Sequence, residues 1–177
     1  MRPIAVLAIA AATVGALAPV GAASAASPSN TESFVMTFQT FDGVDQPTRV
    51  AATGPVQGAG VETQTDVETP DGETVDFTWH LRDGDVYLQA TEDYSMSFDP
   101  QACTAKATGT GTWVITGGTG VYANASGAGT FADRGSFTGA RDHGVCEGPD
   151  SNTPPKTSVF TLKGTGTATL SGQQERS

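Results

Sequence analysis

Short segments in which apolar and polar residues alternate occupy most of the chain after residue 30. The alternation is clearest in 73–81 and 158–170, where every second residue from 75 and from 160 is apolar or glycine. A period of two is typical of a β-strand, because successive side chains point to opposite faces. The predicted strands are 33–41, 49–52, 58–68, 73–81, 85–91, 94–98, 108–115, 127–137 and 158–170. With Gly, Pro and Asp turns between them and no amphipathic helix, they predict an antiparallel barrel or sandwich.

The strands differ in how clearly they show which face is buried. In 73–81, one face carries Val75, Phe77, Trp79 and Leu81 and is expected to point into the core. In 58–68, positions 62, 64, 66 and 68 are all acidic or amide residues. Because an unpaired buried carboxylate is costly, we expect this second face to lie in water.

The segment Gly109–Phe131 combines a strand, a glycine-rich corner over 116–126 and a second strand. Its turn Gly117-Gly118-Thr119-Gly120 has the composition of a phosphate loop. Such a loop must open a helix whose N-terminal amides face the anion, and it usually carries a lysine at fixed spacing. Strands are predicted on both sides here and no Gly-Lys-Ser/Thr follows, so we interpret the segment as a structural turn.

The N-terminal residues have the composition of a signal peptide. Arg2 precedes an apolar region over 4–20, and small residues at 22–26 provide a cleavage site. We therefore predict a signal peptide over 1–26 and a single exported domain over 27–177. An uncleaved membrane anchor is the alternative, but Gly and Pro interrupt the apolar region. We expect a secreted protein with no membrane insertion after cleavage.

The net charge disfavours two classes of binding partner, and the two cysteines predict a disulfide. The chain has 9 Lys+Arg against 19 Asp+Glu, a net charge of −10. This charge opposes binding to nucleic acid and to anionic membrane surfaces. Cys103 and Cys146 are an even pair in an exported chain, which predicts one disulfide; two free thiols are the alternative.

Candidate chemistry is sparse, and no catalytic residue, metal site or cofactor is predicted. Asp76, Thr78 and His80 share a face that could transfer protons or bind a ligand if it lined a barrel. We favour the opposite orientation, with Trp79 pointing inward and His80 in solvent. Tyr122 is interpreted as a packing residue of the corner. The long loop 139–155 could cover a barrel mouth; the full set of candidate cavity or mouth residues is Asp76, Thr78, His80, Tyr122, Arg141 and His143.

The corner over 115–127 resembles a recurrent piece of allene oxide cyclase-like and dirigent-like barrels. The positions that fit are Gly118, Thr119, Gly120, Tyr122, Ala123, Gly127 and Gly129, and the match covers about 25 residues. The tryptophan strand before it is similar to that of many small exported bacterial proteins. The resemblance implies a calycin-like, eight-stranded closed antiparallel barrel with a central cavity, often in a homodimer or homotrimer. It carries no catalytic or ligand-binding position onto this chain.

Three classes of function follow. The first is a non-catalytic module that binds a small apolar molecule or has a structural or interaction role. The second is a cyclase- or dirigent-type enzyme that guides a reactive intermediate by shape, and the third is an extracellular inhibitor or surface-interaction protein. A cavity of several hundred Å³ with convergent polar groups would favour binding or catalysis. A barrel filled by Trp79, Trp113 and phenylalanines would favour a structural role.

Overall fold

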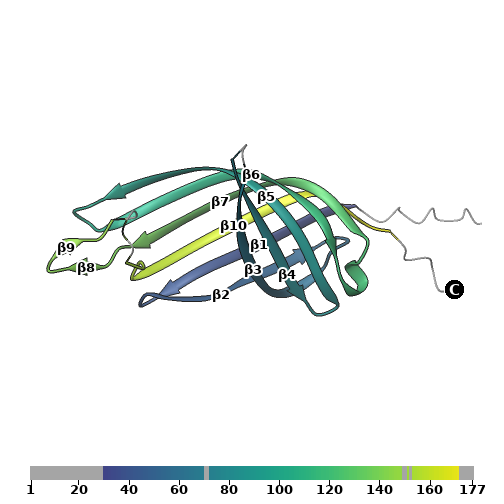
Figure 1. Ribbon diagram of the computed structural model, residues 1–177, viewed down its shortest axis with the longest axis horizontal. Helices are drawn as coiled ribbons and strands as arrows, with labels where there is room; N and C mark the ends of the chain where they lie inside the picture. The colour runs from purple at the N-terminus through teal and green to yellow at the C-terminus, as the bar shows by residue number, and fades with distance from the viewer. Residues whose placement is uncertain (1–29, 70–71, 149–150, 152, 172–177) are drawn as a thin grey trace, which may run out of the picture.

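Eight long strands form a closed antiparallel barrel with the neighbour order β1-β10-β7-β6-β5-β4-β3-β2 (Figure 1). The computed structural model describes residues 30–69, 72–148, 151 and 153–171; the predicted signal peptide lies outside them. The barrel strands are β1 (Thr31–Phe41), β2 (Val44–Thr53), β3 (Gly58–Thr69), β4 (Gly72–Leu81), β5 (Gly84–Asp99), β6 (Thr104–Gly118), β7 (Ala125–Thr138) and β10 (Thr157–Leu170). A 3-10 turn, η1 (Gly120–Tyr122), follows β6, and β8 (Arg141–Asp142) pairs with β9 (Val145–Cys146). The eight-stranded closed barrel is confirmed, and a sandwich is excluded.

The predicted strands are found in place, with two differences. The segments 85–91 and 94–98 belong to one continuous strand, β5, which pairs with β6 along its whole length. The loop predicted over 139–155 contains the short hairpin of β8 and β9. Polar residues at 91–93 interrupt the apolar alternation of β5. For this reason the alternation predicts two strands where the structure has one.

The barrel has two distinct parts. β4 pairs with β5 only as far as Thr91, and β2 pairs with β3 only between 48–52 and 58–62. Beyond these points β5, β6, β7, β10, β1 and β2 continue as a curved sheet, which Figure 1 shows running on past β3 and β4. We call the part in which all eight strands pair the closed half, and the continuing sheet the open half.

The closed half is filled by aromatic side chains. The ring of Phe34 contacts Trp79 and Trp113 edge-on, with centroids 4.6 and 5.5 Å apart. A Cβ at Gly129 or Gly166 would lie 2.7 or 2.6 Å from the Trp113 ring, so the absence of a side chain makes room for the indole. The cavity that remains between these side chains has a volume of about 10 Å³, too small to hold more than one water molecule. No organic ligand fits inside the closed half.

The expectation that the acidic face of 58–68 lies in water is wrong for Glu62. Glu62 pairs with Trp79 across β3 and β4, and the two side chains therefore share the inner face. Glu62 is 7% exposed, whereas its neighbour Val61 is 41% exposed on the outside. The register with β4 sets the orientation of β3, and it overrides the preference of the carboxylate for water.

The glycine-rich corner fastens the end of the closed half. The backbone N–H of Thr119 donates to Asp85 O (2.9 Å), and the N–H of Val121 donates to Asp83 O (3.1 Å). The Tyr122 hydroxyl donates to Gln57 O (2.8 Å) in the connection between β2 and β3. The segment lies between two strands and contains only the three-residue turn η1. Its hydrogen bonds fit the predicted structural turn, with Tyr122 as a packing residue.

Candidate functional site: a trough in the open half

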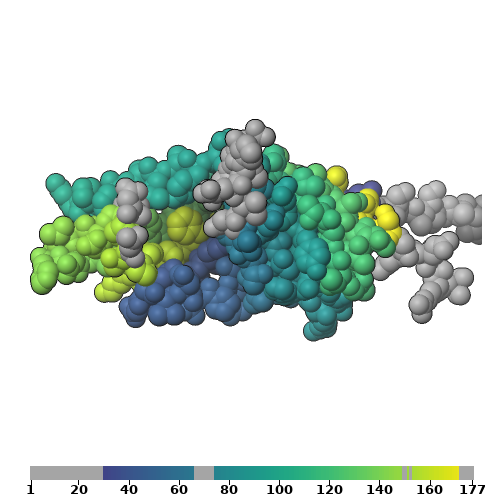
Figure 2. All heavy atoms as spheres, viewed as in Figure 1, coloured from purple at the N-terminus to yellow at the C-terminus, as the bar shows by residue number. Residues whose placement is uncertain are grey.

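The inner face of the open half is an apolar trough. Its side chains continue the inward alternation that begins in the closed half, but β3 and β4 no longer cover them. Figure 2 shows the surface hollowed between β5 on one side and β1 and β2 on the other. The aromatic and sulfur-containing side chains that line it are Phe38, Tyr94, Met96, Phe98, Phe137 and Phe160. Tyr94 is 51% exposed and Met96 39%, although both sit on the concave side of the sheet.

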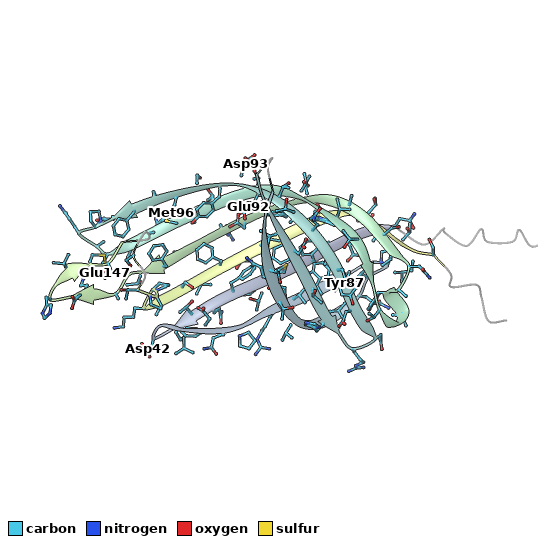
Figure 3. All side chains as sticks on the ribbon, in the orientation of Figure 1. Asp42, Tyr87, Glu92, Asp93, Met96 and Glu147 are labelled. Carbon is cyan, nitrogen blue, oxygen red and sulfur yellow. A yellow bond between two sulfur atoms is a disulfide. The ribbon has the colours of Figure 1, made fainter. Side chains whose placement is uncertain are left out.

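A pocket of about 260 Å³ lies at the far end of the trough. Met96 and Phe137 provide its apolar surface from the sheet, and the chain after β9 provides the other side. Figure 3 shows Met96 on β5 and Glu147 at the same end of the molecule. The residues that line the pocket are Met96, Phe137, Gly139, Glu147, Gly148, Ser151, Thr153, Pro154 and Pro155. Its volume is close to the lower end of the range for small-molecule sites.

A disulfide fixes the loop that covers this end of the trough. Cys103 and Cys146 are bonded, with Cα atoms 5.4 Å apart, as the sequence predicted. The N–H of Gly139 donates to Cys103 O (2.9 Å), and the Arg141 guanidinium donates to Gln101 O (2.8 Å). These contacts join the start of the loop to the connection between β5 and β6. The pocket wall is therefore held by a covalent bond as well as by hydrogen bonds.

The two loop residues predicted at a barrel mouth have different positions. Arg141 borders a wider hollow of about 790 Å³ that it shares with Cys103, Thr138 and Lys156. His143 is exposed at the tip of the hairpin, with its Nε2 3.6 Å from Asp142 Oδ1. Arg141 thus supports the rim through its hydrogen bonds, whereas His143 points into solvent away from the pocket lining.

Two carboxylates lie deeper in the trough, one on each side of Gly109. A side chain at Gly109 would collide with both Glu92 Oε1 and Asp133 Oδ1, so these oxygens share the space above the glycine. Asp133 Oδ1 is buried and has no hydrogen-bond partner among the described residues. Burial raises the pKa of the Tyr94 hydroxyl, and the neighbouring charges of Asp133 and Glu92 raise it further. The trough therefore has an electronegative section beside its aromatic surface.

The predicted cluster of Asp76, Thr78 and His80 lies on the outer face of β4. His80 Nδ1 is 2.9 Å from Asp85 Oδ1, and its Nε2 is 3.1 Å from Thr63 Oγ1. Asp76 Oδ1 accepts a hydrogen bond from Gln89 Nε2 (3.2 Å). Trp79 points inward between them, which is the orientation we favoured. The cluster pairs with neighbouring outer-face side chains and does not reach the trough.

Two buried carboxyl groups in the closed half were not anticipated from the sequence. Burial raises the pKa of Glu32 to about 7, partly offset by the Val56 N–H that donates to Glu32 Oε2 (3.0 Å). Burial also raises the pKa of Glu62 to about 7, partly offset by a hydrogen bond with Thr48 and the charge of His80. One oxygen of each carboxyl has no partner among the described residues. Because burial disfavours their charged forms, both carboxyl groups should make the stability of the fold depend on pH.

Comparisons with known proteins leave the chain without an assigned family. No protein-family model matches it, and neither a curated protein nor a solved structure does so. Within the described ranges, no group of three His, Cys, Asp or Glu side chains is arranged to hold a metal ion. The described part of the chain also contains no helix long and apolar enough to cross a bilayer. The fold defines a closed antiparallel barrel with an apolar trough on the inner face of its open half.

Proposed function

We propose that this protein is a secreted, non-catalytic binding module that holds a small, mostly apolar molecule in the trough of the open half. The observation that carries the proposal is the pocket of about 260 Å³ between Met96, Phe137 and the loop fixed by the Cys103–Cys146 bond. Ligand sites are typically concave and mainly apolar, with a few polar groups that orient the ligand.

The contrast with the closed half supports this location. The closed half leaves about 10 Å³ unfilled, so a ligand has no room there. In the trough, Tyr94 and Met96 leave much of their surface in water on a concave face. Contiguous exposed apolar surfaces of this kind are found at binding sites more often than elsewhere on a protein surface.

The polar groups around the trough indicate the charge of the ligand. Glu147, Ser151 and Thr153 surround the pocket, and Glu92 and Asp133 lie further along the trough. Carboxylates repel an anionic ligand, and the net charge of −10 adds to this effect. The ligand we propose is neutral or cationic, with an apolar body that lies against Met96 and Phe137.

One observation favours the cyclase- or dirigent-type enzyme as a second candidate. Tyr94, Glu92 and Asp133 bring a phenol and two carboxylates together on the inner face. Such a set could move a proton to or from a bound intermediate. Binding alone requires only the apolar pocket, whereas catalysis additionally requires Tyr94 and its neighbours.

The test is a fluorescence titration with N-phenyl-1-naphthylamine, a neutral apolar dye. We expect saturable binding to the wild-type protein and about tenfold weaker binding to Met96→Gln, because burying a methionine contributes roughly 1.5–3 kcal/mol. Val159→Gln is the matched control, since Val159 is 44% exposed but lies on the outer face of β10. The proposal fails if the wild-type protein does not bind the dye, or if both variants weaken binding equally.

A further inference from the structure

The outer edge of β5 has no partner strand in the open half. β4 stops pairing with β5 at Thr91, and none of the described residues pairs with that side of β5 from Asp93 to Asp99. The other side of the same segment pairs continuously with β6. An edge of this kind presents a row of unpaired backbone N–H and C=O groups, which is a template for another strand.

The opposite edge of the open half is protected. There β2 extends past β3 only over 44–47 and carries Pro47, which has no N–H to donate. Proline on a short edge strand is a common way of preventing strand addition. The segment Asp93–Asp99 is longer and contains no proline and no lysine. Only one of the two edges is therefore suited to accept a strand.

The side chains of this edge alternate in a way that defines what could pair with it. Tyr94, Met96 and Phe98 point to the inner face, where Tyr94 and Met96 remain substantially exposed. Asp93, Ser95, Ser97 and Asp99 point outward. An added strand would place every second side chain on the inner face, beside the exposed rings and the methionine.

A second copy of this chain fits poorly along the whole length of the edge; registers centred on Ser95 or Ser97 avoid like charges but pair fewer residues of 93–99. Antiparallel self-pairing centred on Met96 would place Asp93 directly opposite Asp99 at both ends. Shifting the centre by half a residue, to lie between Ser95 and Met96, would place Glu92 opposite Asp99. Like charges directly opposite each other destabilise a sheet, and the net charge of −10 opposes association further. The edge suits a chain of opposite charge.

We propose that the free edge of β5, Asp93–Asp99, binds an extended basic segment of a partner protein by antiparallel strand addition. Lys or Arg lies opposite Asp93 and Asp99, apolar residues opposite Tyr94, Met96 and Phe98, and small polar residues opposite Ser95 and Ser97. Backbone hydrogen bonds supply affinity in such complexes, and alternate side chains supply specificity. This interaction rests on the strand edge and its charges, and it shares Met96 with the small-molecule pocket.

The first test uses two capped peptides of the same composition. Lys-Val-Thr-Val-Thr-Val-Lys has the required alternation, and Lys-Lys-Val-Val-Val-Thr-Thr does not. Calorimetry should show binding at least about tenfold tighter for the first peptide. Amide hydrogen exchange should slow at alternate positions between Asp93 and Asp99, because every second N–H on an edge strand points outward. Equal affinity for the two peptides, or unchanged exchange over this segment, would overturn the proposal.

A charge variant separates the edge from bulk electrostatics. Asp93→Asn with Asp99→Asn keeps the hydrogen bonds that Asp99 Oδ1 accepts from the N–H groups of Gln101 (2.9 Å) and Ala102 (3.0 Å). We expect about tenfold weaker binding of the alternating peptide and a smaller dependence on salt. Asp42→Asn with Asp142→Asn makes the same change of net charge elsewhere and should leave binding unchanged. Equal losses in both double variants would overturn the proposal, as would a free protein that is a dimer with these β5 amides already protected.

Discussion

The same strand behaves differently in the two halves of the barrel. On β5, the inward side chains of Val86, Leu88 and Ala90 are buried, whereas Tyr94 and Met96 on the same face are 51% and 39% exposed. The change occurs after Thr91, where β4 ceases to pair. All of these positions carry apolar or aromatic residues on an alternating pattern. The comparison shows that closure of the sheet, more than residue type, decides which of them form a core and which form a surface.

This difference separates the half that forms the core from the half in which we propose that a ligand binds. The closed half contains both tryptophans and a cavity of only about 10 Å³, so its interior has the dense packing typical of a core. In the open half, aromatic residues lie on a surface that β3 and β4 do not cover. Its end is held by a disulfide instead of by a full set of strands. Substitutions in the two halves should therefore have separable effects.

The largest effect is expected from Trp113→Ala in the closed half. Removing a buried indole leaves a cavity and should lower the free energy of unfolding by about 3–5 kcal/mol. Phe160→Ala, in the trough, removes a partly exposed ring and should cost about 1–2 kcal/mol, since less area returns to water. Urea denaturation of both variants measures the difference. Equal losses would mean that the two halves contribute equally to stability.

Removing the disulfide should have the next largest effect. Cys103→Ser with Cys146→Ser opens a link between residues 43 positions apart and should cost about 2–4 kcal/mol. Since the bond fixes the loop beside Met96 and Phe137, the dye should also bind more weakly. Thermal unfolding and the dye titration follow the two consequences. Loss of stability with unchanged dye affinity would show that the loop is not part of the proposed binding site.

The buried carboxyl of Glu62 should make stability depend on pH. Its pKa rises from 4.5 to about 7 in the folded protein, so the folded state retains a proton that the unfolded chain releases. The contribution of the protonated Glu62 carboxyl to the free energy of unfolding is fully present below about pH 4.5, and it is lost as the pH rises through about 7. Between pH 4.5 and 8, the free energy of unfolding of the wild type should fall by about 1–3 kcal/mol because of Glu62. The Glu62→Gln variant should not show this part of the fall. Urea titrations at both pH values measure it.

The control for this pH effect is Asp142→Asn, on the exposed hairpin of β8 and β9. It should lose the same stability as the wild type over this range. A Glu62→Gln variant whose stability follows the wild-type pH dependence would contradict the burial of the charge. Glu32 contributes in the same direction in every variant, so the comparison between variants isolates Glu62.

The smallest effect on stability is expected from Met96→Gln. Met96 is partly exposed on the trough surface, and surface substitutions usually change stability by less than about 0.5 kcal/mol. Its dye affinity should nevertheless fall. A large loss of stability would place Met96 in the core and weaken the distinction between the halves.

Much of the fold could be predicted from alternation, because strands place successive side chains on opposite faces. The alternation could not show that Glu62 points inward, since pairing with Trp79 decides this and involves a different strand. It also could not show where β3 and β4 end relative to β5, so the trough was missed. The available signal was Tyr94, Met96 and Phe98 on one face, following the acidic residues at 92 and 93. His80, for which the sequence favoured an outward orientation, lies on the outside of the barrel.

Native-state amide hydrogen exchange, with and without N-phenyl-1-naphthylamine, tests the division between the halves most directly. The amides around Trp113 and Ile115 in the closed half should exchange only through global unfolding, with no protection added beyond the dye's effect on overall stability. Those of β9, Glu147 and Gly148 should exchange faster in the free protein, through local opening, and should slow specifically when the dye binds. Uniform exchange across both halves, or specific dye protection confined to the closed half, would contradict the account.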